Sequence, residues 1–552
     1  MPVIIKNREN GLGQILVGME TLANALKITF GPRGRHVMIE KSGDPVKFTR
    51  IGAEVADGFR LSGTFQNLGV SLLRGVAEST YRNAGDGSVM STVMAMKLFK
   101  ECIRLVQSGH SIVDLGKGLL NGAEKVNESL TAFSKPVKTI NQMESLLVTS
   151  SGGDSWIVEP ILSLHKKLGD KGSVTFGYTD GIENKIIFRK GLSFDETYLS
   201  PYFDDPNSES SELDDPFILV CADKITDMEE VLSLTEKISE TDRPLLVIAE
   251  DINDDALSLF LLNKKSGVLN TICVKAPGFG DKRVDLLEDI AAFTGSKVFG
   301  RSLGSPFEKI GPDKLGGAQK VRVERSRTII MDGKGTKSRL KKRLGELRKR
   351  LSEETDDYEK QTMKTRIAKL MAGVATIKIG GYTETEKSLK RSQISHAYST
   401  LLSGMEGGYV PGGGLALMMA ASALEKSRPG NNYEPAYKAL ATSLCAPLVL
   451  LAENSNANGD YIKEKVTDGS FKSGFNALTG KLESVASWPV IDPLKTVLVA
   501  VDTAVSFAVN LLSSEVFIAE KPYVLAEDEA PLLGLKGHKG MRGIAGMEHD
   551  HK

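Results

Sequence analysis

The segment at residues 83–92, Asn-Ala-Gly-Asp-Gly-Ser-Val-Met-Ser-Thr, carries residue types that can bind a phosphate and a metal ion. Its Gly-Asp-Gly turn directly precedes an apolar-periodic run at 89–106, which predicts a helix that begins at the turn. The unpaired N–H groups and positive dipole end of a helix N-terminus favour phosphate. Asp86 can hold Mg²⁺ through oxygen, and Ser88 can hydrogen-bond a phosphate. Such a turn is more often only a helix cap, so the rest of the chain must decide.

The composition is that of a globular protein with several domains. A chain of 552 residues is too long for one core, and its length predicts about three or four domains. Lys plus Arg and Asp plus Glu both number 70, so no global charge attracts nucleic acid or an anionic membrane. We therefore expect no nucleic-acid partner and no membrane partner.

The cysteines and the apolar runs indicate the kind of cellular compartment in which the protein works. Cys102, Cys221, Cys273 and Cys445 lie far apart without Cys-x-x-Cys spacing, which predicts buried thiols in a reducing compartment. The N-terminus has charges where a signal peptide needs an apolar core. The sequence has no run of about 18 apolar residues, so no membrane span is expected.

The secondary structure changes along the chain from helical to mixed and back. Apolar spacing predicts helices near 10–28, 66–84, 88–108 and 112–132. Short apolar runs at 173–176, 185–188, 217–220, 245–248 and 271–274 predict strands that alternate with helices. A charged stretch at 337–370 predicts two helices packed on this α/β part, separated near 355–357. A strand at 375–379 then leads back to helices, so the order predicts an α/β domain nested inside a helical base.

Seven segments in order give the sequence a family resemblance. They are Ile28–Arg35, Gly85–Ser88, Tyr198–Phe203, Pro244–Asp251, Lys275–Asp281, Pro411–Gly414 and Ile491–Pro493. Together they resemble the group I chaperonins, the bacterial GroEL family, from near residue 5 to near residue 525. The Gly/Met-rich C-terminal tail is similar to a degenerate form of the tail of that family.

The resemblance implies an α+β multidomain fold. It predicts a mainly α equatorial base at 1–133 plus 407–552, with a disordered tail at 525–552. A small α/β intermediate hinge domain would occupy 134–189 plus 374–406, and an α/β apical domain would occupy 190–373. The resemblance also implies ATP with Mg²⁺, room for K⁺, non-native protein clients, and a homo-oligomeric ring of seven subunits. The expected location is the bacterial cytoplasm, or the cytoplasm of an infected host if a bacteriophage encodes the chain.

The family's nucleotide site carries over residue by residue. The implied ATP-binding residues are Thr29, Phe30, Gly31, Pro32, Arg50, Asp86, Gly87, Ser88, Val89, Met90, Gly413, Asn476, Ala477 and Asp492. In this set Asp86 would bind Mg²⁺ and act in catalysis, Asn476 and Ala477 would contact the base, and Asp492 the ribose hydroxyls. The chain has no Gly-x-x-x-x-Gly-Lys-Ser/Thr motif, which disfavours a P-loop NTPase.

Two acidic positions of the family are replaced near the expected γ-phosphate. Ile51 follows Arg50 where the family has an aspartate, and an ungapped count places His396 where the family has the aspartate that orients the attacking water. His396 could act as a base, since an imidazole titrates near pH 6.5; the alternative is an ordinary hinge-surface residue. Glu54 and Asp57 are candidate substitutes. We expect ATP binding with slow or differently organised hydrolysis, because removing a positioned base costs about 10²–10⁴-fold in rate.

The resemblance also predicts an apolar groove for client proteins. Its positions here are Tyr198, Tyr202, Phe203, Leu232, Thr235, Leu257, Leu261 and Leu262. Thr226 and Glu229 have capping-box spacing before the first of two helices that would form this groove. Thr235 is polar where the family has leucine, which predicts weaker docking of a lid co-chaperonin or a changed client preference. The sequence leaves open whether a lid partner exists.

The ring-to-ring contact of the family is altered. Val449 and Asn458 stand where the family has an arginine–glutamate pair, while Arg104 fits another basic contact position. This predicts single rings or weakly paired double rings, although surface ion pairs contribute only about 0–1 kcal/mol each. The divergence leaves two origins open, a second chaperonin copy or a bacteriophage gene.

Two functions remain, an ATP-dependent folding machine and a nucleotide-binding holding or structural ring with weak or no hydrolysis. The missing carboxylates favour the second, and the groove fits both. A metabolic enzyme is disfavoured, because the sequence has no nucleophile elbow, no metal-ligand cluster and no dinucleotide fingerprint.

Overall fold

The computed structural model describes residues 3–40, 46–169, 172–204, 210–304, 310–427, 432–485 and 488–520. It divides into two compact units, which are considered separately. The helical unit comprises 1–137 and 399–552, and the sheet unit comprises 138–398. The predicted tail at 525–552 lies outside the described residues. The predicted separation of hinge and apical domains within the sheet unit stays a prediction.

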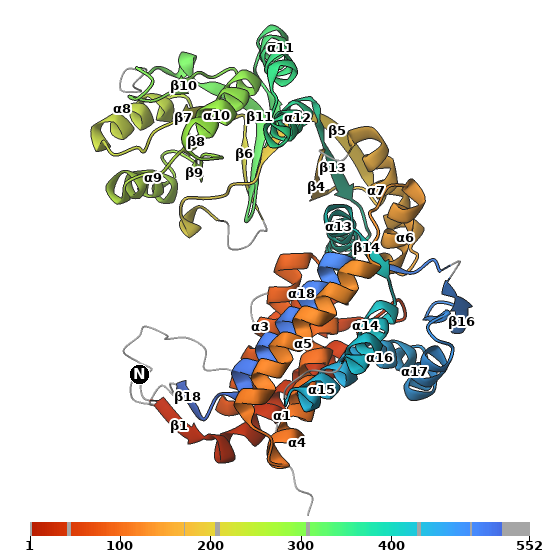
Figure 1. Cartoon of the computed structure of the whole chain (residues 1–552). Helices are drawn as coiled ribbons and strands as arrows, with labels where there is room; N and C mark the ends of the chain where they lie inside the picture. The colour runs from red at the N-terminus through yellow and green to blue at the C-terminus, as the bar shows by residue number, and fades with distance from the viewer. Residues whose placement is uncertain are drawn as a thin grey trace, which may run out of the picture. The chain divides into compact units, whose positions relative to one another are not determined.

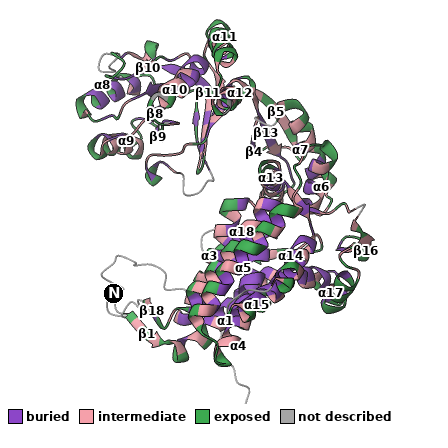
Figure 2. Cartoon of the chain, in the orientation of Figure 1, coloured by how far each residue is buried: buried purple, intermediate pink, exposed green. Residues whose placement is uncertain are grey.

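Long amphipathic helices build the helical unit (Figure 1). They are α1 (Arg8–Lys27), α2 (Gly52–Gly58), α3 (Thr64–Ala84), α4 (Ser88–Gln107), α5 (Ile112–Phe133), α14 (Leu415–Lys426), α15 (Glu434–Leu444), α16 (Ala446–Asn454), α17 (Gly459–Asp468) and α18 (Leu494–Leu512). In α1 the buried residues include Ile15, Met19, Leu22 and Leu26, which the 3.6-residue period places on one face. Figure 2 shows the inward faces of these helices as buried and their outer faces as exposed. The helices predicted in the first third of the chain are confirmed.

The described residues of this unit also form four two-stranded sheets. They are β1 (Val3–Asn7) with β18 (Val516–Glu520), β2 (Val37–Ile39) with β3 (Lys47–Thr49), β14 (Tyr409–Pro411) with β17 (Ile491–Pro493), and β15 (Ser473–Asn476) with β16 (Lys481–Ser484). In the β1–β18 ribbon, Ile5 lies opposite Ile518, and these side chains are 58% and 60% exposed. The ribbon therefore presents apolar surface and unpaired strand edges.

A mixed ten-stranded sheet dominates the sheet unit, which begins with α6 (Ile140–Ser151) and α7 (Ser155–Leu168). Its strand order is β4-β13-β5-β12-β11-β7-β8-β9, with β10 paired to β7 and β6 paired to β11. The strands are β4 (Ser173–Tyr178), β5 (Lys185–Phe194), β6 (Ser210–Asp214), β7 (Phe217–Cys221), β8 (Leu245–Ala249), β9 (Thr271–Lys275), β10 (Val298–Phe299), β11 (Gly316–Glu324), β12 (Thr328–Gly333) and β13 (Gly373–Ile379). All the strands predicted from the sequence are present.

Parallel strands alternate with helices at one end of this sheet. β7, β8 and β9 pair in parallel and are almost entirely buried, as expected for strands covered on both faces. Each is followed by a helix: α8 (Met228–Ser239), α9 (Asp254–Ser266) and α10 (Gly280–Thr294). The helix α13 (Glu384–Gly407) follows β13 and crosses from the sheet unit into the helical unit.

The predicted charged hairpin is confirmed as α11 (Lys337–Glu353) and α12 (Asp357–Met371). It packs on the sheet unit through Leu347 and Leu370, which join its core. Two of its arginines are also buried and meet one carboxylate of α10. Arg343 Nε donates to Asp289 Oδ1 at 2.7 Å, and Arg366 Nε donates to Asp289 Oδ2 at 2.8 Å.

One local prediction needs correction, and two apolar helices bear on the predicted absence of a membrane span. The capping box does not form, because Asp227 is the N-cap of α8 and accepts a hydrogen bond from the Glu229 N–H at 2.9 Å. An aspartate beside the first turn caps it more directly than Thr226 can. In addition, residues 434–454 and 494–512 are long and apolar enough to cross a membrane by length and composition. Shares of 67% and 50% of these windows are buried, as in core helices.

The four cysteines are free and buried, as predicted. Burial raises the pKa of the Cys102 and Cys221 thiols to about 12, and it also raises the pKa values of Cys273 and Cys445. Cys102 and Cys445 lie in the helical unit, whereas Cys221 and Cys273 lie in the sheet unit.

Candidate nucleotide site

The turn between α3 and α4 is built from two glycines in the left-handed region. Gly85 has φ +75° and ends α3, while Gly87 has φ +89° and caps α4. Gly87 has no side chain to cap the helix, and the first turn of α4 contains no acidic residue. The N–H groups of Ser88, Val89 and Met90 therefore have no partner within the helix and can meet an anion. Asp86 stands in this turn, beside these donors.

A second turn, at residues 28–35, is held in place by α16. The Asn454 side-chain amide donates to the carbonyl oxygens of Lys27 at 2.8 Å and Phe30 at 2.9 Å. Gly31 has φ +80°, and a Cβ atom at that position would clash with Leu451. A side chain there would be strained by the positive φ, and Leu451 would have to shift to make room for it. The backbone of this turn is thereby fixed where the predicted phosphate contacts Thr29, Phe30, Gly31 and Pro32 are found.

The third segment, Arg50-Ile51-Gly52, packs on the start of α4. A Cβ atom on Gly52 would lie 2.6 Å from Val89 Cγ2 and 3.3 Å from Ser88 Cβ, so only glycine allows this approach. Ile51 is 5% exposed, and its N–H donates to Thr49 Oγ1 at 3.0 Å. The residue that replaces the family's aspartate is therefore an apolar core side chain. A carboxylate at this position would need a partner or water.

The β14–β17 ladder joins the three-glycine turn to Asp492. Val410 lies opposite Asp492, and the Gly413 N–H donates to Asp492 Oδ2 at 3.1 Å. Gly413 and Gly414 have φ +66° and +80°, and Gly414 caps α14. The pKa of Asp492 is raised to about 7, chiefly by burial and also by the charge of Asp86, while the hydrogen bond from the Gly413 N–H lowers it. Asp86 and Asp492 are therefore close enough for their charges to interact.

The fifth part of the site is the β15 strand with the loop that follows it. Asn476 and Ala477 are buried, and Asn476 Nδ2 donates to Glu483 Oε2 at 3.0 Å. Arg33 Nη2 donates to the Leu478 carbonyl at 2.9 Å, which ties this loop to the 28–35 turn. The turn that carries predicted phosphate contacts is thus linked to the loop that follows the predicted base contacts.

These contacts join segments that are far apart in the sequence into one site on the helical unit. Leu451 lies under both Gly31 and Gly413, Gly52 lies on α4, and Asp86 interacts with Asp492. The predicted site residues of the helical unit are therefore brought together. In the part of the chain that the structure describes, no group of three or more His, Cys, Asp or Glu residues could hold a metal ion. Asp86 still fits Mg²⁺, which usually takes one or two carboxylates together with substrate phosphates and water.

Leu451, Asn454 and Trp488 help to build the site but were missed by the sequence analysis. Leu451 and Asn454 lie on α16, far in sequence from the turns that they support. Trp488 is one of only two tryptophans and stands four residues before Asp492. Its rarity and position were the only sequence signals available.

His396 lies on α13 within the sheet unit and is partly buried. The predicted nucleotide residues belong to the helical unit, so the role of His396 as a base stays a prediction. Of the substitute acids, Glu54 forms an ion pair with Lys47 at 3.2 Å. It therefore already has a cationic partner.

The predicted client groove is formed only in part by exposed side chains. Tyr202, Leu232 and Leu262 are 81%, 46% and 62% exposed. Phe203 and Thr235 were expected in the groove but are 0% and 3% exposed, which corrects the prediction for both. Phe203 joins the core of the sheet unit, and the Thr235 hydroxyl donates to the Val231 carbonyl at 2.9 Å.

The remaining groove positions are intermediate. Tyr198, Leu257 and Leu261 are partly buried and pack against the same core. The Tyr198 hydroxyl donates to the Val323 carbonyl at 2.6 Å, so its polar end is already satisfied. The open apolar surface is therefore narrower than the sequence predicted, and α8 and α9, which pack together, carry most of it.

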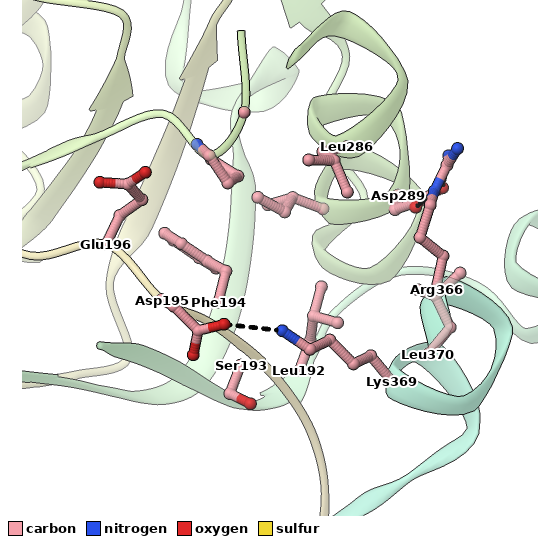
Figure 3. A pocket seen from close by; sticks show the side chains of 13 residues that line it. Leu192, Ser193, Phe194, Asp195, Glu196, Leu286, Asp289, Arg366, Lys369 and Leu370 are labelled. Atoms are coloured by element: carbon pink, nitrogen blue, oxygen red, sulfur yellow. Dashed lines mark hydrogen bonds and ion pairs between the residues drawn. The ribbon is translucent and has the colours of Figure 1, made fainter. Parts of the chain in front are cut away.

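A separate cavity of about 240 Å³ lies in the sheet unit (Figure 3). Its lining includes Leu192 and Phe194 of β5, Leu286 of α10 and Leu370 of α12. Figure 3 shows an ion pair at its rim, where Lys369 Nζ lies 3.1 Å from Asp195 Oδ2. None of the predicted nucleotide residues lines this cavity, so it is a separate feature.

The altered ring-contact positions have local roles. Asn458 is the N-cap of α17 and accepts a hydrogen bond from the Tyr461 N–H at 2.9 Å. Val449 packs against Gly459, where an added Cβ would lie 2.6 Å from Val449 Cγ1. Arg104 is exposed and pairs with Glu101 at 3.0 Å.

The arrangement defines a class of protein, a multidomain α+β chain. Its helical unit holds a glycine-lined site, and two helices of its sheet unit expose apolar side chains. The chain belongs to the TCP-1/cpn60 chaperonin family, because the model of that family matches residues 22–522. Family membership implies an oligomeric ring and client proteins, and members of the family are ATPases.

Solved structures support the same fold. The chain resembles the chaperonin gp146 from the bacteriophage EL 2 (Pseudomonas aeruginosa), crystallised in the presence of ATP-BeFx. In crystal form II the TM-score is 0.70 at 18% identity, covering 94% of this chain and 100% of that chain. In crystal form I the TM-score is 0.64 at 18% identity, covering 94% and 99%. At this identity the likeness establishes the fold alone.

Proposed function

We propose that this chain is an ATP-dependent chaperonin subunit that binds non-native proteins in a ring and promotes their folding. The observation that carries the proposal is the glycine cradle of the helical unit, where Gly31, Gly87 and Gly413 all adopt positive φ around Asp86 and Asp492. Crystals of the structurally similar phage chaperonin were grown with ATP-BeFx, which is consistent with this assignment.

Each wall of the cradle has a role in the proposed site. The free N–H groups at the start of α4 would bind phosphate oxygens, and the turn around Gly31 would bring further backbone against them. Arg50 would add positive charge, and Asp86 would hold Mg²⁺, which neutralises charge on the phosphates. Asp492 would accept from the ribose hydroxyls, while Asn476 and Ala477 would face the base.

Exposed apolar side chains on α8, on α9 and near residue 202 support client binding. Tyr202, Leu232 and Leu262 expose apolar surface on neighbouring elements, and gathered apolar surface can mark a protein-binding site. Burial of such surface is non-directional and contributes about 25 cal/mol per Å², so many unrelated segments could dock. Clients would bind through exposed apolar stretches and be released when nucleotide binding moves the apical part.

A second function, a holding ring with weak hydrolysis, is favoured by one observation. Ile51 is buried beside Gly52, which packs on the start of α4, and its side chain cannot hold a metal ion or take a proton. If His396 does not replace the missing base, turnover falls by about 10²–10⁴-fold. Such a ring would bind nucleotide and clients without rapid cycling.

Assembly is part of the proposal. We propose a homo-oligomeric ring of seven subunits, single or weakly paired, in the cytoplasm of a bacterium or an infected host. The local roles of Asn458 and Val449 support weak ring pairing, since neither side chain carries a charge for the other ring. Docking of a lid co-chaperonin is left open.

One experiment separates the two functions. ATP turnover by the purified protein is measured beside its ability to refold a chemically denatured client, with and without ATP. A folding machine gives ATP-dependent refolding and steady phosphate release. A holding ring suppresses aggregation equally well without ATP and releases little phosphate.

His396→Ala tests the proposed base in the same assay. Loss of most turnover with unchanged ATP binding assigns His396 to catalysis. Rapid turnover in the wild type that survives His396→Ala excludes that role. A protein that neither retains ATP nor suppresses aggregation would refute both functions.

A further inference from the structure

The Trp488 indole lies against two glycines of the nucleotide site. A Cβ atom on Gly474 would lie 2.7 Å from Trp488 Cζ2 and Cη2, so the absence of that side chain gives the ring its space. A Cβ atom on Gly413 would lie 3.7 Å from Trp488 Cζ2. The benzo edge of the indole therefore runs along the backbone of both residues.

This location is a corner between the two parts of the site that would hold a nucleoside. Gly413 is hydrogen-bonded to Asp492, the predicted ribose contact. Gly474 lies in β15, two residues before Asn476, the predicted base contact. The Phe475 carbonyl oxygen would lie 3.6 Å from the same Gly413 Cβ position, which shows how close the ribose turn and β15 are.

Trp488 is held by a hydrogen bond of its backbone, whereas the indole nitrogen makes none within the described residues. The backbone N–H of Trp488 donates to the Val485 carbonyl at 3.2 Å. Trp488 Nε1 is buried and has no hydrogen-bond partner within the described residues. A buried indole N–H usually finds a partner, so the position is not explained by the ring's own hydrogen bonding.

We propose that Trp488 is a specificity-determining residue that forms an aromatic wall of the nucleobase pocket and favours purine over pyrimidine nucleotides. The inference rests on the proposed nucleotide site and adds a base-selective element to it. A purine offers a larger apolar face than a pyrimidine to an aromatic side chain, so it gains more from this wall. The phosphate-binding parts of the site do not depend on Trp488.

Variants of the full-length protein test this role through base selectivity. Equilibrium dialysis with labelled ATP and CTP measures both affinities in the wild type, Trp488→Phe and Trp488→Leu. We expect Trp488→Leu to weaken ATP binding about tenfold, a change of about 1.4 kcal/mol, and CTP binding less than about twofold. Trp488→Phe should retain most of the preference because it keeps an aromatic ring. An ATP-to-CTP ratio unchanged in Trp488→Leu overturns the proposal.

The chain supplies a matched optical control, because Trp156 on α7 is its other tryptophan. In Trp156→Phe all tryptophan emission comes from Trp488, and we expect ATP to change it with the midpoint measured by dialysis. Unchanged emission at saturating ATP would overturn the contact. If dialysis detects no ATP retention in the wild type, the nucleotide site itself is refuted, and the role of Trp488 with it. Retention without base selectivity refutes the role of Trp488 alone.

Discussion

Replacing Asp492 with asparagine should stabilise the nucleotide-free protein at neutral pH. The folded-state pKa of Asp492 is raised from 3.8 to about 7, first by burial and then by the charge of Asp86. Asparagine removes the charge and keeps an oxygen that can accept from the Gly413 N–H. The substitution therefore relieves the electrostatic cost and preserves the hydrogen bond.

The pH dependence has a definite sign. Below pH about 4 the carboxyl is protonated in both the folded and the unfolded chain, so it has no effect on the free energy of unfolding. Between pH about 4 and about 7 the unfolded chain loses its proton while the folded chain keeps it, and stability falls as pH rises. Above pH about 7 the full cost is present and stays constant.

The magnitude follows from the two pKa values. A difference of about 3 units at 1.36 kcal/mol per unit sets an upper limit of about 4 kcal/mol. The Asp492 side chain is partly exposed, so solvent screening reduces this, and we expect roughly 2 kcal/mol. Urea unfolding followed by circular dichroism at pH 4 and pH 8 measures the difference between Asp492→Asn and the wild type.

A matched control is Glu128→Gln, because Glu128 is an exposed acid on α5 of the same unit. We expect Asp492→Asn to raise the unfolding midpoint at pH 8 and to leave it almost unchanged at pH 4, while the control changes neither. An equal shift at both pH values, or destabilisation at pH 8, would refute the assignment of an ionised, repelled carboxylate at this position.

Three further predictions concern other parts of the chain. Ile51→Asp should lower the free energy of unfolding by about 2–3 kcal/mol, because it replaces a buried apolar side chain with a carboxylate. It should raise phosphate release about 10²-fold if the missing carboxylate limits hydrolysis, and a folded variant with unchanged turnover contradicts this limit. Asp289→Asn removes the more buried of the two carboxylates that Arg343 and Arg366 share, while Asp285 remains, and should cost about 2–3 kcal/mol in the sheet unit. Asp195→Asn at the exposed rim should cost less than about 1 kcal/mol, and equal effects would argue against a buried network. Ile5→Lys places a charge on the exposed ribbon opposite Ile518, so native mass spectrometry should detect smaller assemblies with unchanged ATP binding, and an unaltered mass distribution would exclude the ribbon from subunit contacts.

The sequence predicted most elements because their residues carry strong local signals. The helical spacing of Ile15, Met19, Leu22 and Leu26, and the buried runs of β7, β8 and β9, depend only on neighbours in the chain. The glycine turns were also found, since positive φ at Gly87 and Gly413 is a local property. Family resemblance then supplied the order of the domains.

The failures share a different cause, which is dependence on tertiary neighbours. Phe203 and Thr235 were expected in an open groove, but packing of the 3-10 turn at Pro201–Phe203 and of α8 buries both. The supports of the nucleotide turns, Leu451 and Asn454, act across more than 400 residues of sequence. No periodicity or motif within α16 indicates which distant carbonyl oxygens an asparagine amide will reach.

Because each unit contains buried thiols, their reactivity can report how often that unit opens. Each unit contains two of them, and each is shielded from reagents while its unit stays folded. An alkylating agent applied under native conditions would therefore modify Cys102 and Cys445 at the opening rate of one unit, and Cys221 and Cys273 at that of the other. Peptide mass mapping of such a time course, with and without nucleotide, would rank the two units by kinetic resistance without any engineered label.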